Sequence, residues 1–182
     1  NPTPKPGWIP MPRTNPMHLP KWLAVPLVAL TLPATAQLAA QDPDWKELDA
    51  PPPPAFELSR LLPFEVSAGS TLKFGIDPAT LQLGSDGILR YVVVARSSTG
   101  TVNAMYEGLR CSTGEVRTYA RYNASSGWTA ADSSAWKSIW SSQPSRHTLM
   151  FARQGGCVGN APPRTTQDVV RELKNQNFEK IR

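Results

Sequence analysis

Few side chains in this sequence are placed to do nucleophilic or metal chemistry. Ser134 and Lys137 match the Ser-x-x-Lys pattern, in which a lysine amine one helical turn away activates the serine of penicillin-binding enzymes. The Ser-Asp-Asn and Lys-Thr-Gly sequences that accompany this pattern do not occur here. His147 is the one histidine after His18, and there is no Gly-x-Ser-x-Gly motif, so a hydrolase triad is not indicated. One imidazole and two cysteines do not predict a metal site, and we expect no cofactor.

Two glutamates on neighbouring predicted strands are candidates for acid–base chemistry. Glu107 and Glu115 would lie across a hairpin, and glycan hydrolysis requires a pair of carboxylates. Three arginines at positions 110, 117 and 121 are close to them in the sequence, so cross-strand ion pairs explain the same acids without catalysis. We favour the ion pairs.

Arginine and aromatic side chains concentrate in the same region and predict a binding surface. Both groups are common in binding hot spots and suit flat or anionic partners. Alternatively, Tyr122, Trp136 and Trp140 belong to the core, and Arg117 and Arg121 form a solvated strand face. The predicted binding residues are Asn103, Tyr106, Glu107, Arg110, Tyr119, Arg121, Trp128 and Arg146.

A predicted antiparallel meander must position these residues. Segments Ile88–Arg96, Val102–Arg110 and Glu115–Tyr122 have the pattern of strands and are joined by short turns that contain glycine. Ile88–Arg96 is apolar on both faces at its centre, which is typical of a strand covered on both sides. A further strand is predicted over Leu72–Ile76. In the last strand of the meander, alternation places Val116, Thr118, Ala120 and Tyr122 on one face and Glu115, Arg117, Tyr119 and Arg121 on the other.

Helices are predicted after the meander. Thr165–Lys174 has a threonine cap, Asp168 in its first turn and an apolar stripe. Ser133–Trp140, with two tryptophans four residues apart, predicts a short helix, whereas Ser145–Arg153 fits a short helix or a strand. The predicted fold class is α+β: an antiparallel sheet built on a central meander, with short helices and a C-terminal helix packed on one face.

The first 36 residues predict an upstream segment and a secretory signal peptide. Met11 and Met17 are candidate starts, an apolar run covers Trp22–Leu32, and cleavage is expected after Ala36 or, alternatively, Ala40. The run is about half of the roughly 20 residues that a bilayer requires, so we expect no transmembrane span in the mature chain.

Charge and cysteine content fit an exported protein. The net charge of the 182 residues is +5, but the first 36 contain three basic and no acidic side chains, so the rest is nearly neutral and nucleic acid is not an expected partner. In an oxidising compartment, Cys111 and Cys157 are expected to form a disulfide. Two buried free thiols are the alternative.

The mature chain is predicted to have three parts. Residues 37–55 form an acidic, proline-rich tether, 56–175 a single α+β domain, and 176–182 a frayed tail. The run Pro51–Pro54 favours a stiff polyproline II conformation. It either docks in an aromatic groove or is a spacer that lies on the domain's own surface.

Several segments occur together in the order of one known family, and the chain resembles the CNP-like family (cryptic neisserial protein) of small exported proteobacterial proteins. The resemblance covers about Asp44 to Lys174. It implies an envelope domain of unknown biochemical function, sometimes described as an outer-membrane protein, and it supplies no catalytic residues. The segments are Asp44–Glu47, Leu72–Pro78, Arg90–Ala95, Asn103–Cys111, Tyr119–Tyr122 and Pro144–His147.

The functional prediction is an exported, non-enzymatic interaction module of the bacterial envelope. We expect it in the periplasm, with peripheral attachment to the outer membrane as an alternative, and we expect an envelope protein or a cell-wall component as its partner. The alternative is a small peptidoglycan-directed hydrolase that uses Glu107 or Glu115.

Overall fold

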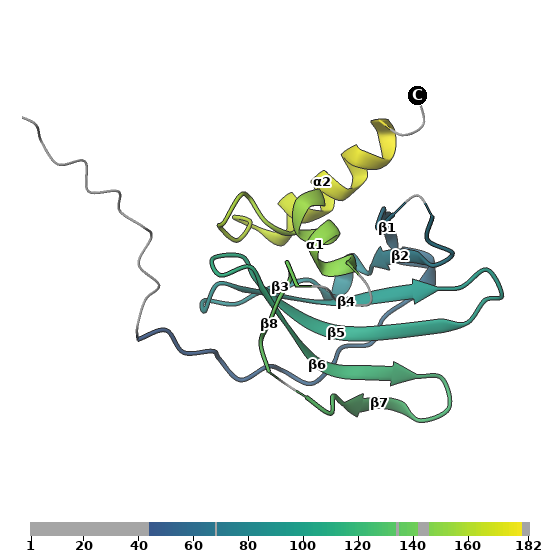
Figure 1. Ribbon diagram of the computed structural model, residues 1–182, viewed down its shortest axis with the longest axis horizontal. Helices are drawn as coiled ribbons and strands as arrows, with labels where there is room; N and C mark the ends of the chain where they lie inside the picture. Colours follow the sequence, from purple (N-terminus) through teal and green to yellow (C-terminus); the bar gives the residue numbers. More distant parts are fainter. Residues whose placement is uncertain (1–43, 68, 134, 142–145, 180–182) are drawn as a thin grey trace, which may run out of the picture. The chain divides into compact units, whose positions relative to one another are not determined.

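The computed structural model describes residues 44–67, 69–133, 135–141 and 146–179 (Figure 1). The predicted signal peptide and both candidate starts lie outside these residues, as does Ser134 of the Ser-x-x-Lys match. Within the described ranges, no helix combines the length and apolar character that a membrane crossing needs.

An antiparallel sheet of eight strands forms the centre of the fold. The strands are β1 (Leu62–Phe64), β2 (Lys73–Ile76), β3 (Gln82–Leu83), β4 (Ile88–Arg96), β5 (Val102–Arg110), β6 (Glu115–Asn123), β7 (Gly127–Ala130) and β8 (Lys137–Ser138). Six of them lie in the order β1-β2-β4-β5-β6-β7, while β3 pairs with β4 and β8 pairs with β6. The predicted meander is confirmed as β4, β5 and β6, and the α+β fold class is confirmed with it.

Strand β4 is buried on both faces, as its apolar run predicts. Tyr91 and Val93 point toward the helices, whereas Val92 and Val94 belong to a second apolar cluster on the opposite face. All four side chains are fully inaccessible to solvent. The sheet therefore separates two cores, and each face needs its own cover.

A β-bulge in β6 changes which side chains share a face. Tyr106 pairs with Ala120 but Glu107 pairs with Thr118, so Tyr119 is an extra residue on β6. The predicted strict alternation along this strand is therefore wrong beyond the bulge. Tyr119 and Ala120 both pack in the second cluster, and Arg121 is turned toward the helical side.

Helices cover one face of the sheet (Figure 1). They are α1 (His147–Phe151) and α2 (Thr166–Glu179), with an irregular turn over Ala152–Gly156 directly after α1. The segment Ser145–Arg153 is thus helical where the structure describes it. Leu149, Phe151, Val169 and Leu173 from these elements share one buried apolar cluster with residues of β1, β2, β4 and β5.

Helix α2 begins as the sequence predicts and extends further. The hydroxyl of Thr165 accepts a hydrogen bond from the backbone N–H of Asp168 at 3.2 Å, and the Asp168 carboxylate accepts one from the backbone N–H of Thr165 at 3.1 Å. This reciprocal cap satisfies two donors at the helix start. The backbone stays helical to Glu179, five residues past the predicted end at Lys174.

The predicted disulfide between Cys111 and Cys157 is confirmed. It joins the residue after β5 to the residue after the irregular turn, and so ties the helical layer to the meander. The two cysteines are separated by 46 residues, and closing such a loop is worth about 3–4 kcal/mol in the chain-entropy account.

An extended segment, residues 44–57, lies on the other face of the sheet and is called the N-terminal segment below. Phe56 packs edge-on against Tyr122 and Trp128, with ring centroids 5.1 and 5.9 Å away. Residues 51–53 of the proline run border a hollow that Tyr119 and Trp128 also line. The proline run therefore lies beside aromatic residues of its own domain.

The short helix predicted over Ser133–Trp140 is not formed by the described residues of that segment. Lys137 and Ser138 instead form β8, in which Lys137 pairs with Val116 on β6. The backbone N–H of Ile139 donates to the carbonyl of Gly114 at 2.9 Å. Pairing with the edge of the sheet satisfies these backbone groups, and it overrides the local helical pattern.

Candidate binding site

A pocket of about 240 Å³ opens on the helical side of the sheet, between β5, β6, β8 and α1. We call it the α1 pocket. Met105, Val116, Ile139 and Leu149 supply its apolar walls. Its polar lining includes Glu107, Thr118, Arg121, Asp132, Ser133, Lys137, Arg146, His147 and Thr148.

Glu107 on β5 forms the floor of the pocket and is 2% exposed. Its carboxylate accepts hydrogen bonds from Tyr91 Oη at 3.1 Å and from Thr148 Oγ1 at 3.3 Å. The ring Nε2 of His147 lies 3.1 Å from both carboxylate oxygens. A buried carboxylate is stable only with such partners, and Glu107 finds them on β4 and α1.

His147 is the first residue of α1 and is 8% exposed. Its ring stacks on Phe74 at a centroid distance of 5.7 Å, which fixes the plane of the imidazole. Burial lowers the pKa of His147, but the charge and hydrogen bonds of Glu107 raise it by more, and the result lies above the ordinary value of 6.5. Arg121 opposes this rise.

The Glu107 carboxylate is correspondingly stabilised in its charged form. Burial raises the pKa of Glu107, yet the charge of His147 and hydrogen bonds from His147, Tyr91 and Thr148 outweigh it, so the pKa lies below 4.5. Burial also raises the pKa of Tyr91 well above 10, so this phenol remains a donor. Glu107 and His147 are therefore a buried ion pair whose oxygens are already engaged.

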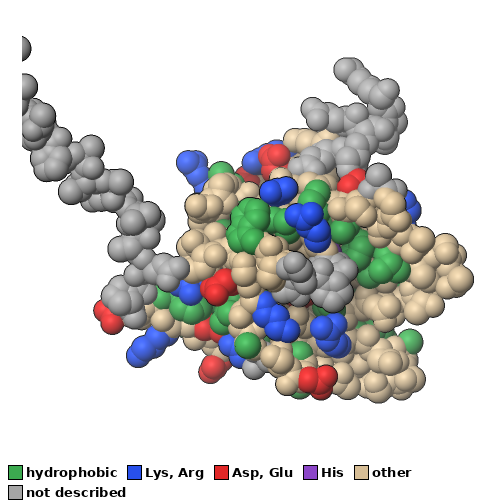
Figure 2. Space-filling view, viewed as in Figure 1, with side chains coloured by type: hydrophobic (Ala, Val, Ile, Leu, Met, Phe, Trp, Pro, Cys, Tyr) green, Lys and Arg blue, Asp and Glu red, His purple; other side chains and the backbone are tan. Residues whose placement is uncertain are grey.

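Three cationic side chains surround the pocket entrance. Arg121, Lys137 and Arg146 are exposed and come from β6, β8 and the residue before α1. Asp132 is the acidic residue among the exposed lining groups. Figure 2 shows Lys and Arg side chains gathering on the face of the molecule that carries β8 and α1. Since the buried Glu107 is neutralised by His147, the entrance favours anionic groups.

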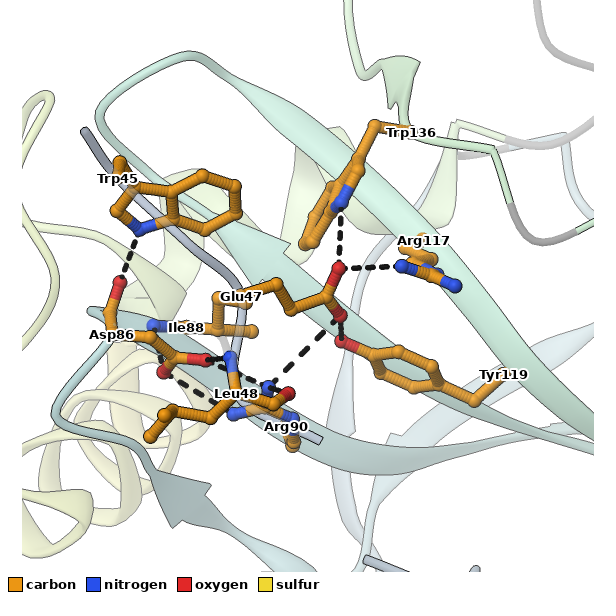
Figure 3. Close-up of polar contacts among 9 residues, drawn as sticks. All are labelled: Trp45, Glu47, Leu48, Asp86, Ile88, Arg90, Arg117, Tyr119 and Trp136. Atoms are coloured by element: carbon orange, nitrogen blue, oxygen red, sulfur yellow. Dashed lines mark hydrogen bonds and ion pairs between the residues drawn. The ribbon is translucent and has the colours of Figure 1, made fainter. Parts of the chain in front are cut away.

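The wall formed by residues 135–139 is held from the opposite side by the N-terminal segment (Figure 3). Ala135 and Lys137 line the pocket, whereas the indole N–H of Trp136 between them donates to the Glu47 carboxylate at 3.0 Å. Glu47 also accepts a hydrogen bond from Tyr119 Oη at 2.7 Å and forms an ion pair with Arg117. One carboxylate on the far face therefore fixes the wall.

A second polar group anchors the N-terminal segment beside Glu47 (Figure 3). Asp86 forms an ion pair with the nearly buried guanidinium of Arg90 at 2.8 Å, and it accepts a hydrogen bond from the backbone N–H of Leu48 at 3.0 Å. Arg90 in turn donates to the Leu48 carbonyl at 2.9 Å. The ion pair of Asp86 and Arg90 thus satisfies both backbone polar groups of Leu48.

The structure brings some of the predicted binding residues together and separates others. Glu107, Arg121 and Arg146 line the α1 pocket. Tyr106, Tyr119 and Trp128 border the hollow beside the proline run, on the opposite face. Two further predicted residues belong to neither group. Asn103 is exposed near the start of β5, and the Arg110 guanidinium lies 3.5 Å from the centroid of the Trp45 ring.

The two glutamates that were candidates for paired catalysis also lie apart. Glu107 lines the α1 pocket, whereas alternation along β6 before the bulge places Glu115 on the face of Arg117. In β5 and β6, Glu115 is opposite Arg110, and Glu107 is opposite Thr118. The ion-pair partner of Glu107 is His147 rather than one of the three arginines. These positions do not offer two carboxylates to one substrate.

Sequence reasoning did not select six of the polar residues that line the pocket: Thr118, Asp132, Ser133, Lys137, His147 and Thr148. Lys137 was considered within the Ser-x-x-Lys match, but its role there assumed a helix. The segment around Asp132 and Ser133 has no periodic pattern, so no local signal relates it to the pocket. Among the described residues, no group of three or more His, Cys, Asp or Glu side chains could hold a metal ion.

Comparisons with known proteins agree with the extent of this fold. No curated protein and no solved structure matches the chain. Residues 40–174 match the model of the CNP1-like family, and this range includes the N-terminal segment, the sheet, α1 and most of α2. Because the match covers most of the sequence, the chain belongs to the CNP1-like family.

Proposed function

We propose that this protein is an exported, non-enzymatic binding domain of the bacterial cell envelope. Its α1 pocket binds an anionic group on another envelope component, either a protein or a piece of the cell wall. The observation that carries this proposal is the arrangement of charge at the pocket. Three cationic side chains surround the entrance, while the acid at the floor is already paired with His147.

The polar groups at the floor of the pocket are already hydrogen-bonded to one another, and this supports a binding role over a catalytic one. A general base needs a lone pair directed at the substrate, and a general acid needs a proton to give at working pH. The carboxylate oxygens of Glu107 are already hydrogen-bonded to Tyr91, Thr148 and His147, and the pKa of Glu107 is lowered rather than raised. The floor is therefore suited to holding the pocket's shape, and the exposed cations to holding a ligand.

Export to the periplasm is supported by two independent features. The sequence predicts a signal peptide that ends at Ala36 or Ala40. The Cys111–Cys157 disulfide needs an oxidising compartment to form and persist.

Site-specific photo-crosslinking in cells tests the proposal. A photo-reactive residue replaces Ser133, which is exposed at the pocket entrance, and a second strain carries it at Ser98, which is exposed in the turn between β4 and β5. We expect a discrete crosslinked product from position 133 and none from position 98. Mass spectrometry then identifies the product.

Charge reversal supplies the matched control. Arg121→Glu with Lys137→Glu should abolish the product, whereas Lys73→Glu with Arg96→Glu, two exposed cations on β2 and β4, should leave it unchanged. If the product survives reversal at the pocket, or forms equally from both positions, the α1 pocket is not the binding site.

Cell-wall hydrolysis is the second candidate, favoured by the position of a carboxylate–imidazole pair at the floor of a pocket. Digestion of purified peptidoglycan by the wild-type protein and by Glu107→Gln tests it. Activity in the wild type and its loss in the variant, with the fold intact by circular dichroism, would establish a hydrolase. Absent or equal activity in both would remove Glu107 as a catalyst.

A further inference from the structure

The two most exposed large apolar side chains among the described residues border two adjoining hollows. Trp140 is 62% exposed and Val158 is 66% exposed. Trp140 borders a hollow of about 560 Å³, and Val158 borders a neighbouring one of about 770 Å³. Arg153 and Cys157 line both hollows, so the two hollows adjoin at these residues, and together they are called the groove below.

A disulfide and a close ring contact constrain the groove. The Cys111–Cys157 disulfide forms part of the floor and holds the end of β5 against the turn after α1. The Trp140 ring lies directly over Gly114, where a Cβ atom would come within 2.7 Å of the indole nitrogen. Gly114 also has a φ of +65°, so glycine is needed there for two reasons. An exposed indole that is held in place loses little entropy when a partner covers it.

Positive charge accompanies the apolar surface. The guanidinium of Arg153 lies 5.5 Å from the centroid of the Trp140 ring, and Arg164 lines the second hollow. The structure gives neither arginine a carboxylate partner within its described ranges. The acids at this end, Asp168 and Glu172, are both within ion-pairing distance of Arg171. The groove thus offers two cations that are available to a ligand.

We propose that this groove binds an extended segment of another protein that carries an apolar side chain next to an acidic one. The apolar side chain packs on Trp140 or Val158, and the carboxylate pairs with Arg153 or Arg164. Tryptophan and arginine are the residues most enriched at the centre of protein interfaces. The two hollows are concave and can receive the side chains of a peptide. Binding to a membrane surface instead requires apolar side chains that protrude into the lipid. Ile139 and Leu149 line both the first hollow and the α1 pocket, but the cations of the two sites are different residues. The proposal does not depend on the function proposed for the α1 pocket.

Selection from a random peptide library tests the proposal, with the immobilised mature chain, from residue 37 onward, as the target. We expect enriched peptides to combine an apolar residue with Asp or Glu, and to bind in fluorescence polarisation. Trp140→Ala and Arg153→Glu should each weaken the best peptide about tenfold or more. Leu72→Ala, just before β2, and Lys73→Glu, at its first residue, change exposed side chains; they are the matched controls and should not change the affinity of the peptide.

A charge swap makes the result decisive. A peptide in which Lys replaces the acidic residue should bind Arg153→Glu better than it binds the wild type. Enrichment of peptides without acidic residues, or no enrichment at all, would overturn the proposal. Binding of vesicles of anionic phospholipid that Trp140→Ala abolishes, in the absence of peptide binding, would assign the surface to a membrane instead. Arg121→Glu with Lys137→Glu should leave peptide binding unchanged, so a failure here and a failure at the α1 pocket are distinguishable.

Discussion

The two faces of the sheet are covered by different kinds of structure, and their polar residues are used differently. On one face, α1 and α2 bury their apolar side chains in one cluster with β1, β2, β4 and β5, and a disulfide ties this layer to the meander. On the other face, an extended segment rich in proline lies over Val92, Val94 and Tyr106. The backbone N–H and C=O groups of a helix are hydrogen-bonded within the helix, whereas those of an extended segment need partners on the sheet or in water.

The difference appears in where each face holds its charges. The helical side contains an almost fully buried ion pair, Glu107 and His147, on two elements of the core. On the other side Asp86 and Arg90 form a buried pair within the sheet, but the Glu47 carboxylate of the N-terminal segment is 15% exposed. We therefore expect the Glu107–His147 pair to control global stability and Glu47 to control local attachment.

The largest effect is expected from Glu107→Ala. This change leaves His147 and the hydroxyl of Tyr91 buried without their partner, and breaking a buried pair in this way costs about 3–5 kcal/mol. Urea denaturation would measure the loss in the free energy of unfolding. Glu107→Gln keeps the shape and part of the hydrogen bonding, so its cost should be smaller.

Glu115→Ala is the matched control for this variant. Glu115 is half-buried on the other face of the same hairpin, and its removal should cost less than about 1 kcal/mol. An equal loss in the two alanine variants would contradict the assignment of global stability to the helical side.

The sequence predicts the parts of this fold that are encoded by short-range patterns. The apolar run of β4, the glycine-containing turns of the meander and the capping residues of α2 are all local signals, and each element forms as predicted. The disulfide was predictable because the chain contains one pair of cysteines. These predictions need no knowledge of which distant residues meet.

The remaining features depend on contacts between residues far apart in the sequence. Glu47 accepts hydrogen bonds from Tyr119 and Trp136, which are 72 and 89 residues away in the sequence. No sequence pattern near Glu47 predicts these partners. The bulge at Tyr119 is equally invisible, since strict alternation is the expectation for any such strand. Gly108 makes room for it: a Cβ atom there would lie 2.5 Å from the Tyr119 hydroxyl oxygen. Arg121 reaches the α1 pocket because of this one extra residue.

A smaller and more local effect is expected from Glu47→Ala. The change removes hydrogen bonds from Tyr119 and Trp136 and the ion pair with Arg117, at a cost of about 2 kcal/mol. Limited proteolysis should then cut the N-terminal segment faster while α2 stays protected. Because Trp136 belongs to the wall of the α1 pocket, crosslinking from position 133 should also decrease.

Asp49→Ala is the control for the Glu47 variant. Asp49 is exposed two residues further along the same segment, and its loss should leave both the free energy of unfolding and the cleavage rate unchanged. If Glu47→Ala instead unfolds the whole domain without a preceding release of the segment, the two faces do not differ in the way that we infer.

The smallest effect is expected from pH acting on the Glu107–His147 pair. The lowered pKa of Glu107 gives stability that is complete above its ordinary value of 4.5 and is lost as pH falls through the lowered value. The raised pKa of His147 gives stability that is complete below its ordinary value of 6.5 and is lost as pH rises through the raised value. The pair therefore contributes most between these two pH values, and its contribution falls on both sides.

Measuring this contribution requires a difference between two proteins, because other groups titrate as well. Asp77 and Asp86 also have lowered pKa values, through their bonds to Arg60 and Arg90, and they weaken the folded state in acid whether or not the pair is present. We would measure the free energy of unfolding of the wild type and of the double variant Glu107→Gln with His147→Gln from about pH 3 to about pH 9. The difference between the two proteins cancels the contributions of Asp77 and Asp86. A difference that peaks between pH 4.5 and 6.5 supports a charged pair. A difference that is flat with pH would mean that Glu107 and His147 are held together as neutral hydrogen-bonding groups, and the charge at the pocket floor would have to be reassigned.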